Sequence, residues 1–431
     1  MASTYIYRNA SSSVTSDTTF TFSMWFKRGK VGTNETLFCH ENESSHTQKL
    51  DLHFVDDQFR MGWYNGSSEF NLDTKMVFRD PNAWYHLVFR YDTTQSTASD
   101  RVRIYVNGVL QELEQINGSD PTSQYPSQNI TLNLGQKKMV YGRYQAASPS
   151  RYWCGSMSHL IYCDGQSYAP TEFGETDTTT GEWRIKDLTA SDLTWGTNGH
   201  WLLKDGISLT DASSNSNNFT ASGNLTKTED NPSNNFCTLS PLMQRTNQYF
   251  SGNATSLVFA HGNTYAGKVT HGTYFGTIGV SSGKYYWEIK VEDTNNAFGI
   301  MAMRPTGGVT YGYSDATSNM YYPYSDYYYT NGVAGSNGSG DFDNTSNKIY
   351  SFALDATNNK LWIGRDGTFV GDPANGTGAT WSSLPTGHDW TPVCHPMATT
   401  QENNSWFNFG NGYFGTTAVS PEGTNASGIG K

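Results

Sequence analysis

Residues 347–371 (NKIYSFALDATNNKLWIGRDGTFVG) contain three short apolar runs separated by two tight-turn signals. From 350 to 354 every second side chain is large and apolar, and such side chains share one face of an extended strand. The turns at 358–359 and 366–367 consist of Asn, Asp and Gly, which tolerate the positive φ angles of two-residue hairpins. The segment therefore predicts a meander of antiparallel strands.

The composition of the whole chain favours an all-β protein. Aromatic residues make up 14% and charged residues 16% of the 431 residues, and Asn, Ser, Thr and Gly are abundant. Strong helix formers are therefore scarce, whereas strand and turn formers are frequent. A chain of this length is long enough for two or three domains.

The meander resembles the C-terminal half of the SPRY family, in which a strand ends in an aromatic-x-x-Asn/Asp-Gly turn. Residues 283–291 (GKYYWEIKV) and 298–301 (FGIM) are similar to the opening strands of that family, and 406–410 (WFNFG) to its closing Asn-Phe-Gly. The resemblance implies a bent, antiparallel β-sandwich over residues 241–431 that binds partners through its loops.

The first part of the chain contains a series of further strands. They are predicted at 18–27, 50–54, 59–63, 84–91, 102–106 and, from Ile130, Leu132 and Leu134, at 130–134. Residues 18–27 carry large apolar side chains at alternate positions, which is typical of a half-buried strand. Asp56-Asp57 and Asn107-Gly108 are hairpin signals. Strands separated by polar turns favour a sandwich over βαβ units.

These strands are similar to the laminin-G-like, concanavalin A-like group of jelly-roll domains. The similarity rests on 20–27 (FTFSMWFK), 84–87 (WYHL) and 103–108 (RIYVNG). The tail from 155–166 (GSMSHLIYCDGQ) to 173–175 (FGE) resembles a variant common in tailed-phage virion proteins. The resemblance implies a second antiparallel sandwich, over residues 1–176. Residues 177–240 are too apolar for a flexible tether, so we expect an ordered connector there.

Charge and cysteine content restrict the partners and the compartment. A formal charge of −11 with 28 Lys plus Arg argues against nucleic acid and against an anionic membrane surface. Five scattered cysteines favour buried thiols of a protein made in a reducing compartment. No signal peptide or transmembrane run is recognised. We expect a protein made in the host cytoplasm and carried in the virion.

Catalytic and metal-binding patterns find no support. The Glu-x-Asp-x-x-Glu strand of concanavalin A-like glucanases is missing from the sequence. Glu288 and Glu292 share a strand face but would lie roughly 13 Å apart, whereas glycosidases need about 5 to 9.5 Å. Asp341 and Asp343 in a Gly/Ser/Asn-rich loop suit turn capping better than a structural calcium ion. We expect no enzyme activity and no cofactor.

Two Cys-His pairs, Cys39-His40 and Cys394-His395, are the remaining metal candidates. Neither has the CxxC or paired-His spacing of a zinc site. Buried cysteine beside an ordinary histidine is the favoured interpretation.

The unusual feature of the chain is 311–329 (YGYSDATSNMYYPYSDYYY), which holds eight tyrosines in nineteen residues. Tyrosine combines an apolar ring with a hydroxyl and suits sugar stacking or a protein interface. The alternative is that the rings cover the sheet or make subunit contacts. The candidate ligand-binding residues are Tyr321, Tyr322, Tyr324, Tyr327 and Tyr328.

Together these features predict an accessory structural protein of a tailed-phage virion, either a capsid appendage or a tail or fibre component. Its expected activity is adhesion to a host-surface glycan or protein through sandwich loops. The rival functions are a glycan depolymerase and a purely architectural subunit without ligand. Sheet edges need covering, so a homo-oligomer or docking on other virion proteins is expected.

Overall fold

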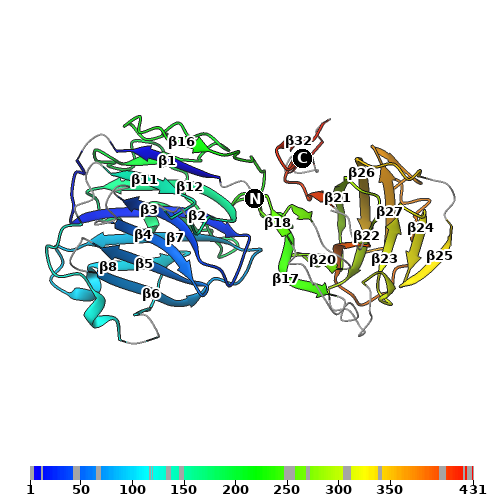
Figure 1. Ribbon diagram of the computed structural model, residues 1–431, viewed down its shortest axis with the longest axis horizontal. Helices are drawn as coiled ribbons and strands as arrows, with labels where there is room; N and C mark the ends of the chain where they lie inside the picture. Colours follow the sequence, from blue (N-terminus) through cyan, green and yellow to red (C-terminus); the bar gives the residue numbers. More distant parts are fainter. Residues whose placement is uncertain are drawn as a thin grey trace. The chain divides into compact units, whose positions relative to one another are not determined.

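The computed structural model describes residues 4–10, 13–41, 49–64, 69–115, 118, 120–132, 137–144, 150–246, 258–267, 272–303, 312–337, 342–397, 404–420, 423–424 and 430. The chain forms two compact units (Figure 1). Unit 1 comprises Met1–Lys227 and Asn231–Asn235, and unit 2 comprises Thr228–Asp230 and Phe236–Lys431. Most of the segment for which we expected a connector, 177–240, therefore belongs to unit 1.

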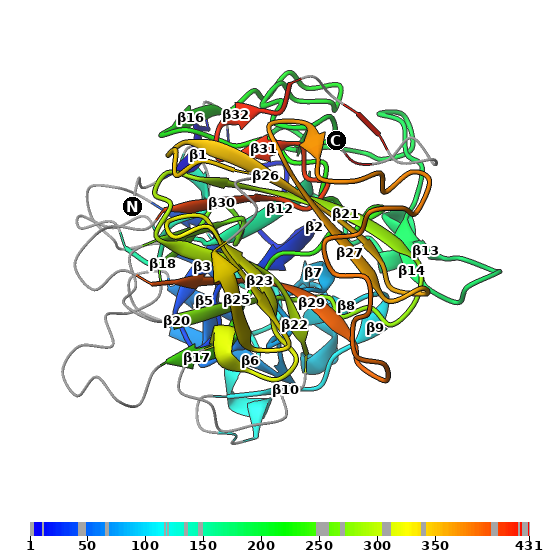
Figure 2. The same cartoon turned by 90° about the vertical axis from the view of Figure 1, so that its right-hand side faces the viewer.

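Unit 1 is built from two antiparallel sheets and one small hairpin. The eight-stranded sheet has the order β10 (Leu113–Glu114), β6 (Glu69–Val77), β5 (Gln58–Tyr64), β4 (Lys49–Val55), β3 (Glu35–Glu41), β11 (Lys138–Tyr141), β1 (Tyr5–Asn9) and β16 (Thr220–Ser222). The six-stranded sheet has the order β15 (His200–Leu202), β12 (Gly155–Asp164), β2 (Thr19–Arg28), β7 (Trp84–Asp92), β8 (Val102–Val106) and β9 (Val109–Leu110). The hairpin of β13 (Gly174–Thr176) and β14 (Trp183–Ile185) projects from the unit (Figure 2). The described residues of the unit also form short 3-10 helices, namely η1 (Ala98–Asp100), η3 (Pro121–Gln124) and η4 (Pro170–Glu172).

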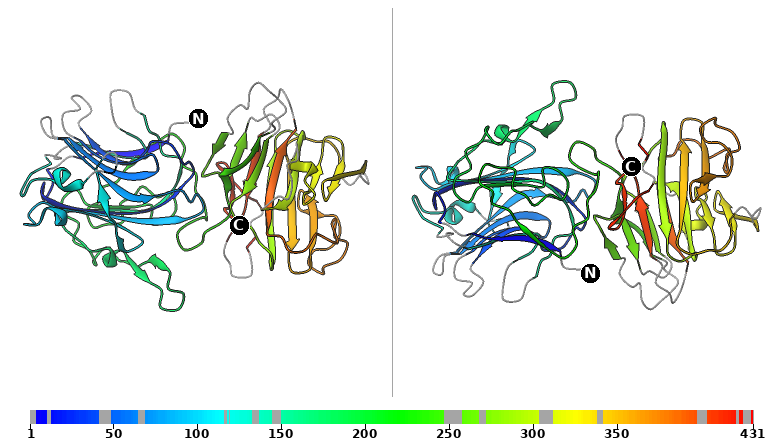
Figure 3. Two further views of the ribbon diagram at one scale, coloured as in Figure 1. Left: turned by 90° about the horizontal axis from the view of Figure 1, so that it is seen from below. Right: turned by 90° about the horizontal axis from the view of Figure 1, so that it is seen from above.

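One apolar core lies between the two layers of unit 1 (Figure 3). The alternate residues of β2 from Phe20 to Phe26 point into it, as predicted. Phe22 meets Phe38 of β3 from the other sheet, with ring centroids 4.3 Å apart. Each such fully buried ring stabilises the fold by about 1.5–3 kcal/mol relative to exposure.

The opposite face of β2 is buried too, so the prediction of a half-buried strand was wrong. Trp25 and Lys27 are each only 3% exposed. The Trp25 ring stacks on His86 of β7, and Lys27 Nζ donates to Asn235. On the neighbouring strand β12, Ile161 lies in a separate apolar cluster with Trp195 and Trp201. The aromatic residues that suggested a connector thus cover the six-stranded sheet.

The predicted strand at Ile130, Leu132 and Leu134 is not formed by the described residues 130–132, and Leu134 lies outside them. Leu132 is nevertheless fully buried in the core. Its amide donates to the carbonyl of Asp17 and that of Ile130 to the carbonyl of Ser127, so neither amide joins a sheet ladder. The alternating apolar residues of this segment thus indicated burial correctly, but the segment is irregular and does not form a strand.

Unit 2 also consists of two antiparallel sheets, each with seven strands. The first has the order β17 (Leu239–Thr246), β20 (Gly272–Gly276), β29 (Trp390–Pro396), β22 (Asn296–Ala302), β23 (Asn319–Tyr322), β24 (Tyr327–Thr330) and β25 (Val333–Asn337). The second has the order β18 (Val258–Ala260), β19 (Tyr265–Gly267), β30 (Ser405–Asn408), β21 (Lys284–Val291), β26 (Lys348–Asp355), β27 (Lys360–Arg365) and β28 (Thr368–Phe369). A turn of 3-10 helix, η5 (Gly312–Ser314), and the hairpin of β31 (Tyr413–Phe414) and β32 (Thr417–Ala418) complete it.

The predicted meander is confirmed as β26, β27 and β28. Asn359, Asp366 and Gly367 have φ angles of 56°, 49° and 85°, as the two hairpin turns require. Tyr350 and Phe352 of β26 point into the core between the sheets, where the Tyr350 ring lies 4.7 Å from that of Phe298 in the other sheet. The all-β class and the two antiparallel sandwiches are therefore confirmed.

Candidate functional site

The outer face of the eight-stranded sheet carries a polar pocket. Because side chains alternate along a strand, Leu50, Leu52 and Phe54 of β4 enter the core and the residues between them face outwards. The same alternation on β5 and β6 adds outward polar residues. The pocket has a volume of about 250 Å³. Its lining residues are Lys49, Asp51, His53, Arg60, Gly62, Trp63, Asn71 and Arg151, and we call it the Gly62 pocket.

Cross-strand register sets the layout of the Gly62 pocket. Asp51, Gly62 and Asn71 are direct neighbours across β4, β5 and β6. His53, Arg60 and Asp73 form the adjacent row. A Cβ atom on residue 62 would lie 3.0 Å from Asn71 Oδ1 and 3.6 Å from His53 Cε1. The missing side chain of Gly62 thus leaves space at the centre of the two polar rows.

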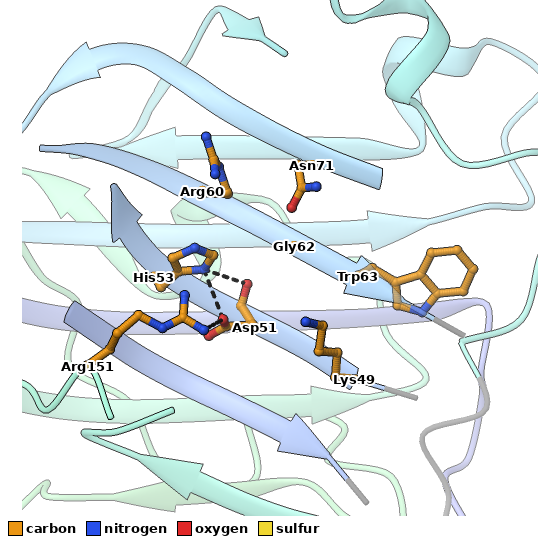
Figure 4. A pocket seen from close by; sticks show the side chains of 8 residues that line it. All are labelled: Lys49, Asp51, His53, Arg60, Gly62, Trp63, Asn71 and Arg151. Atoms are coloured by element: carbon orange, nitrogen blue, oxygen red, sulfur yellow. Dashed lines mark hydrogen bonds and ion pairs between the residues drawn. The ribbon is translucent and has the colours of Figure 1, made fainter. Parts of the chain in front are cut away.

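The charged residues around this space are ordered by ion pairs. Arg60 donates through Nε and Nη2 to the two carboxylate oxygens of Asp73, at 2.6 and 2.7 Å. Arg151 Nη2 donates to Asp51 Oδ2 at 2.6 Å, although Arg151 precedes β12 and is distant in sequence (Figure 4). Asp51 and Asp73 are each only 2% exposed. Buried carboxylates of this kind need such partners to remain charged.

His53 completes the inner wall of the Gly62 pocket. Its Nδ1 lies 3.4 Å from the backbone carbonyl oxygen of Asp51 and 3.2 Å from Asp51 Oδ2, and both are acceptors. The N–H is therefore on Nδ1, and Nε2 is the acceptor atom of the neutral ring. Burial lowers the pKa of His53, and the charge of Asp51 opposes that effect only in part. His53 is therefore neutral near pH 7.

Tyr144 holds the two cations of the outer rim. The guanidinium of Arg151 lies 4.0 Å from the centre of its ring, and Lys49 Nζ lies 3.3 Å from its hydroxyl. Cation–π contact and hydrogen bonding fix both side chains against one ring. The ring of Trp63, by contrast, packs in the core, so the pocket is walled mainly by polar groups.

The arrangement presents hydrogen-bond donors and acceptors to a small polar ligand. The donors come from Lys49, Arg60 and Arg151, and the acceptors from His53 and Asn71. The volume is below the 300 to 1,000 Å³ typical of drug-sized ligands, which suits one small ring. Both carboxylates are held by arginines, and among the described residues no group of three potential metal ligands is found.

The tyrosines predicted as a binding surface are divided between two faces of one sheet. Tyr321 is fully buried between the sheets, with Tyr328 packed beside it. Tyr322 and Tyr327 lie on the outer face, in a cluster with Met301 and Met320. Tyr324 is 56% exposed, whereas Tyr311 lies outside the described residues. Most of these rings thus help to cover the sheet, and the role of the five candidate tyrosines in ligand binding stays a prediction.

The other sequence candidates are engaged with neighbouring residues. Glu288 accepts from Tyr286 and Asn408, and Glu292 from Asn404 and Trp406. Asp343 pairs with Arg365, and Asp341 lies outside the described residues. All five cysteines are free thiols, and Cys39, His40, Cys394 and His395 are buried.

Sequence analysis did not predict the Gly62 pocket, because its polar residues alternate with core residues, as they do on any strand with one solvent-facing side. A signal was available in the register. The predicted turn at Asp56-Asp57 already places His53 opposite Arg60 and Asp51 opposite Gly62. Ionisable residues paired across strands around a glycine in the middle of a sheet would have predicted a polar pocket at that glycine.

Comparison with known proteins agrees with this architecture. Residues 2–160 match the family described as the Concanavalin A-like lectin/glucanases superfamily, so this part of unit 1 is similar to concanavalin A-like, laminin-G-like domains. A search of curated proteins gives no match.

Three solved structures are similar to parts of the chain or to most of it. The SPRY domain of human HERC1 is 15% identical, with a TM-score of 0.29, and the match covers 39% of this chain and 96% of that one. Domains LG4-5 of the mouse laminin alpha1 chain are 9% identical, with a TM-score of 0.31 and coverage of 98% and 94%. A candidate carbohydrate-binding protein from Bacteroides ovatus is 16% identical, with a TM-score of 0.33 and coverage of 52% and 58%. Scores of this size carry no functional information.

Proposed function

We propose that unit 1 binds carbohydrate in the Gly62 pocket. The observation that carries this proposal is the pair of polar cross-strand rows around the space left by Gly62. Sugar hydroxyls both donate and accept hydrogen bonds, and the pocket offers partners of both kinds on buried, ion-paired side chains. The match of this region to a lectin and glucanase superfamily supports the same ligand class.

Binding without hydrolysis is the activity that fits the site best. Glycosidases require one carboxyl group that can give up a proton and a second that acts as base or nucleophile. Asp51 and Asp73 are instead engaged by Arg151 and Arg60. The proposal is therefore a lectin-like protein rather than a depolymerase.

We further propose that the chain serves adhesion as an accessory protein of a tailed-phage virion, on the capsid, tail or fibre. The resemblance of 155–166 and 173–175 to virion proteins supports this placement, and the SPRY-like motifs support a partner-binding role for residues 241–431. Other virion proteins or further copies of the chain would then cover its sheet edges. Among the described residues no helix is long and apolar enough to span a membrane.

A glycan array probed with the full chain tests the binding proposal. The variant Gly62→Val fills the centre of the Gly62 pocket without changing a charge, and valine is a good strand residue. Gly423→Val is the matched control, because a Cβ atom there meets open space. We expect glycan signals from the parent chain and the control, and their loss with Gly62→Val. Equal signals from both variants would exclude this pocket as the site.

A further inference from the structure

Among the residues that line the Gly62 pocket, cations outnumber carboxylates. Lys49, Arg60 and Arg151 line it together with Asp51, whereas Asp73 and Asp56 act on Arg60 from beside the pocket. The rest of the protein is acidic, with a formal charge of −11 for the whole chain. A local excess of positive charge in a partly buried site favours an anionic ligand, because charges are screened less there than at the surface.

Each arginine retains donors beyond those used in its ion pair. Arg60 uses Nε and Nη2 for Asp73, and Arg151 uses Nη2 for Asp51. Among the described residues neither Arg60 Nη1 nor Arg151 Nη1 has a hydrogen-bond partner. The carboxylates hold both guanidinium groups in place, so little entropy is lost when the remaining N–H groups bind an anion.

His53 lies between these two arginines in the wall of the pocket (Figure 4). It is only 6% exposed, and its Nδ1 is engaged by Asp51. Nε2 has no partner among the described residues. An acceptor that lines the pocket in this way can accept from a donor such as a hydroxyl group. Asn71 Oδ1, next to the space over Gly62, is a second acceptor.

We propose that the Gly62 pocket selects a sugar that carries a carboxylate, such as a uronic acid unit of an acidic glycan. The carboxylate binds between Arg60 and Arg151, and neighbouring hydroxyls donate to His53 and Asn71. This inference rests on the proposed carbohydrate binding and names its ligand class. A neutral sugar would leave the Nη1 donors of the two arginines unmatched, and a simple carboxylate would offer no hydroxyl group to His53 Nε2.

Titration calorimetry with matched sugars tests the inference on the unaltered chain. The probes are methyl galacturonide, methyl galactoside and the methyl ester of the same galacturonide, which removes only the charge. Methyl glucuronide and methyl glucoside form a second matched set. Charge-assisted hydrogen bonds predict that one of the uronides binds about 10- to 100-fold more tightly than its neutral partner and its ester.

The variant Arg151→Gln tests the assigned residue. We expect it to reduce the preference for the uronide over its ester and its neutral partner to within about threefold, because uronide binding should weaken more than neutral-sugar binding. Arg184→Gln is the matched control, since Arg184 is also ion-paired in unit 1 but lies on β14. If loss of the Asp51 partner unfolds Arg151→Gln, the ester comparison still decides the matter.

The outcomes separate this inference from the function on which it rests. Equal binding of uronide, ester and neutral sugar would overturn the carboxylate assignment and leave carbohydrate binding intact. A preference for a sulfated sugar over the uronide would also overturn it. Absence of binding by every sugar in these sets and on the array would contradict the proposed function itself.

Discussion

The two units cover the outer faces of their sheets with different chemistry. In unit 1 the outer face of the eight-stranded sheet buries ion pairs and a histidine around Gly62. In unit 2 the outer face of the sheet containing β22 and β23 buries Met301, Met320 and Tyr322. Apolar covering stabilises a fold without further partners, whereas buried charges are costly to desolvate. The buried charges of unit 1 are therefore the basis of the carbohydrate-binding proposal, and a ligand contact of the unit 2 tyrosines stays a separate prediction.

The largest expected effect concerns the buried charges of unit 1. Arg28 is almost fully buried and binds Asp57 and Glu35. Arg28→Met should destabilise unit 1 by about 3–5 kcal/mol, because Asp57 and Glu35 lose a buried cation. Arg79 is another partner of Asp57, but the Arg79 side chain is 63% exposed. Arg79→Met should therefore lower the free energy of unfolding by less than about 1 kcal/mol. Denaturant unfolding of both variants measures the difference, and equal losses would show that burial does not distinguish the two arginines.

A smaller contrast is expected within the tyrosine cluster of unit 2. Tyr321→Ala removes a ring that contacts Phe298, Phe342 and Tyr350 in the core. We expect the free energy of unfolding to fall by about 3 kcal/mol, because the ring is no longer buried and a cavity is left behind. Tyr324→Ala, at an exposed position, should change stability by no more than about 0.5 kcal/mol. Thermal unfolding checks the pair. A loss of glycan binding with Tyr324→Ala would restore the tyrosine site as a candidate.

The smallest expected effect is a difference in acid sensitivity between the units. Burial lowers the pKa of His40 and His86 to about 3 and of His159 to about 4, all in unit 1. The unfolded state then binds protons first as pH falls below about 6.5, so stability is lost progressively down to about pH 3. Glu35 acts in the opposite direction, because burial raises its pKa to about 7, but the histidines outnumber it.

Hydrogen exchange at pH 7 and pH 4.5, corrected for the intrinsic rate, separates the units. Amides of β2, β7 and β12 should lose protection at pH 4.5 relative to those of β21 and β26. In unit 2 the pKa of His261 is lowered by desolvation as well, but the surface of this histidine is exposed. A greater loss in unit 2 would contradict the expected order.

The fold could be predicted further than the site. Local signals determined β2, β4, β5 and the meander of β26 to β28, because alternation and turn residues act within a few positions. The packing of Trp195 and Trp201 against Ile161 of β12 could not be predicted in this way, since it depends on contacts between distant segments. Arg151 and Asp51 are likewise 100 residues apart in the sequence, so no local spacing pattern predicts their ion pair. The part of the site that could be predicted from the sequence was the pairing register of β4 and β5.

The most direct test of carbohydrate binding is a crystal structure of the full chain soaked with the best glycan from the array. The account predicts a sugar unit over Gly62, with hydrogen bonds to Arg60, Arg151 and His53. A sugar bound at Tyr324 or elsewhere, with the Gly62 pocket empty, would contradict it.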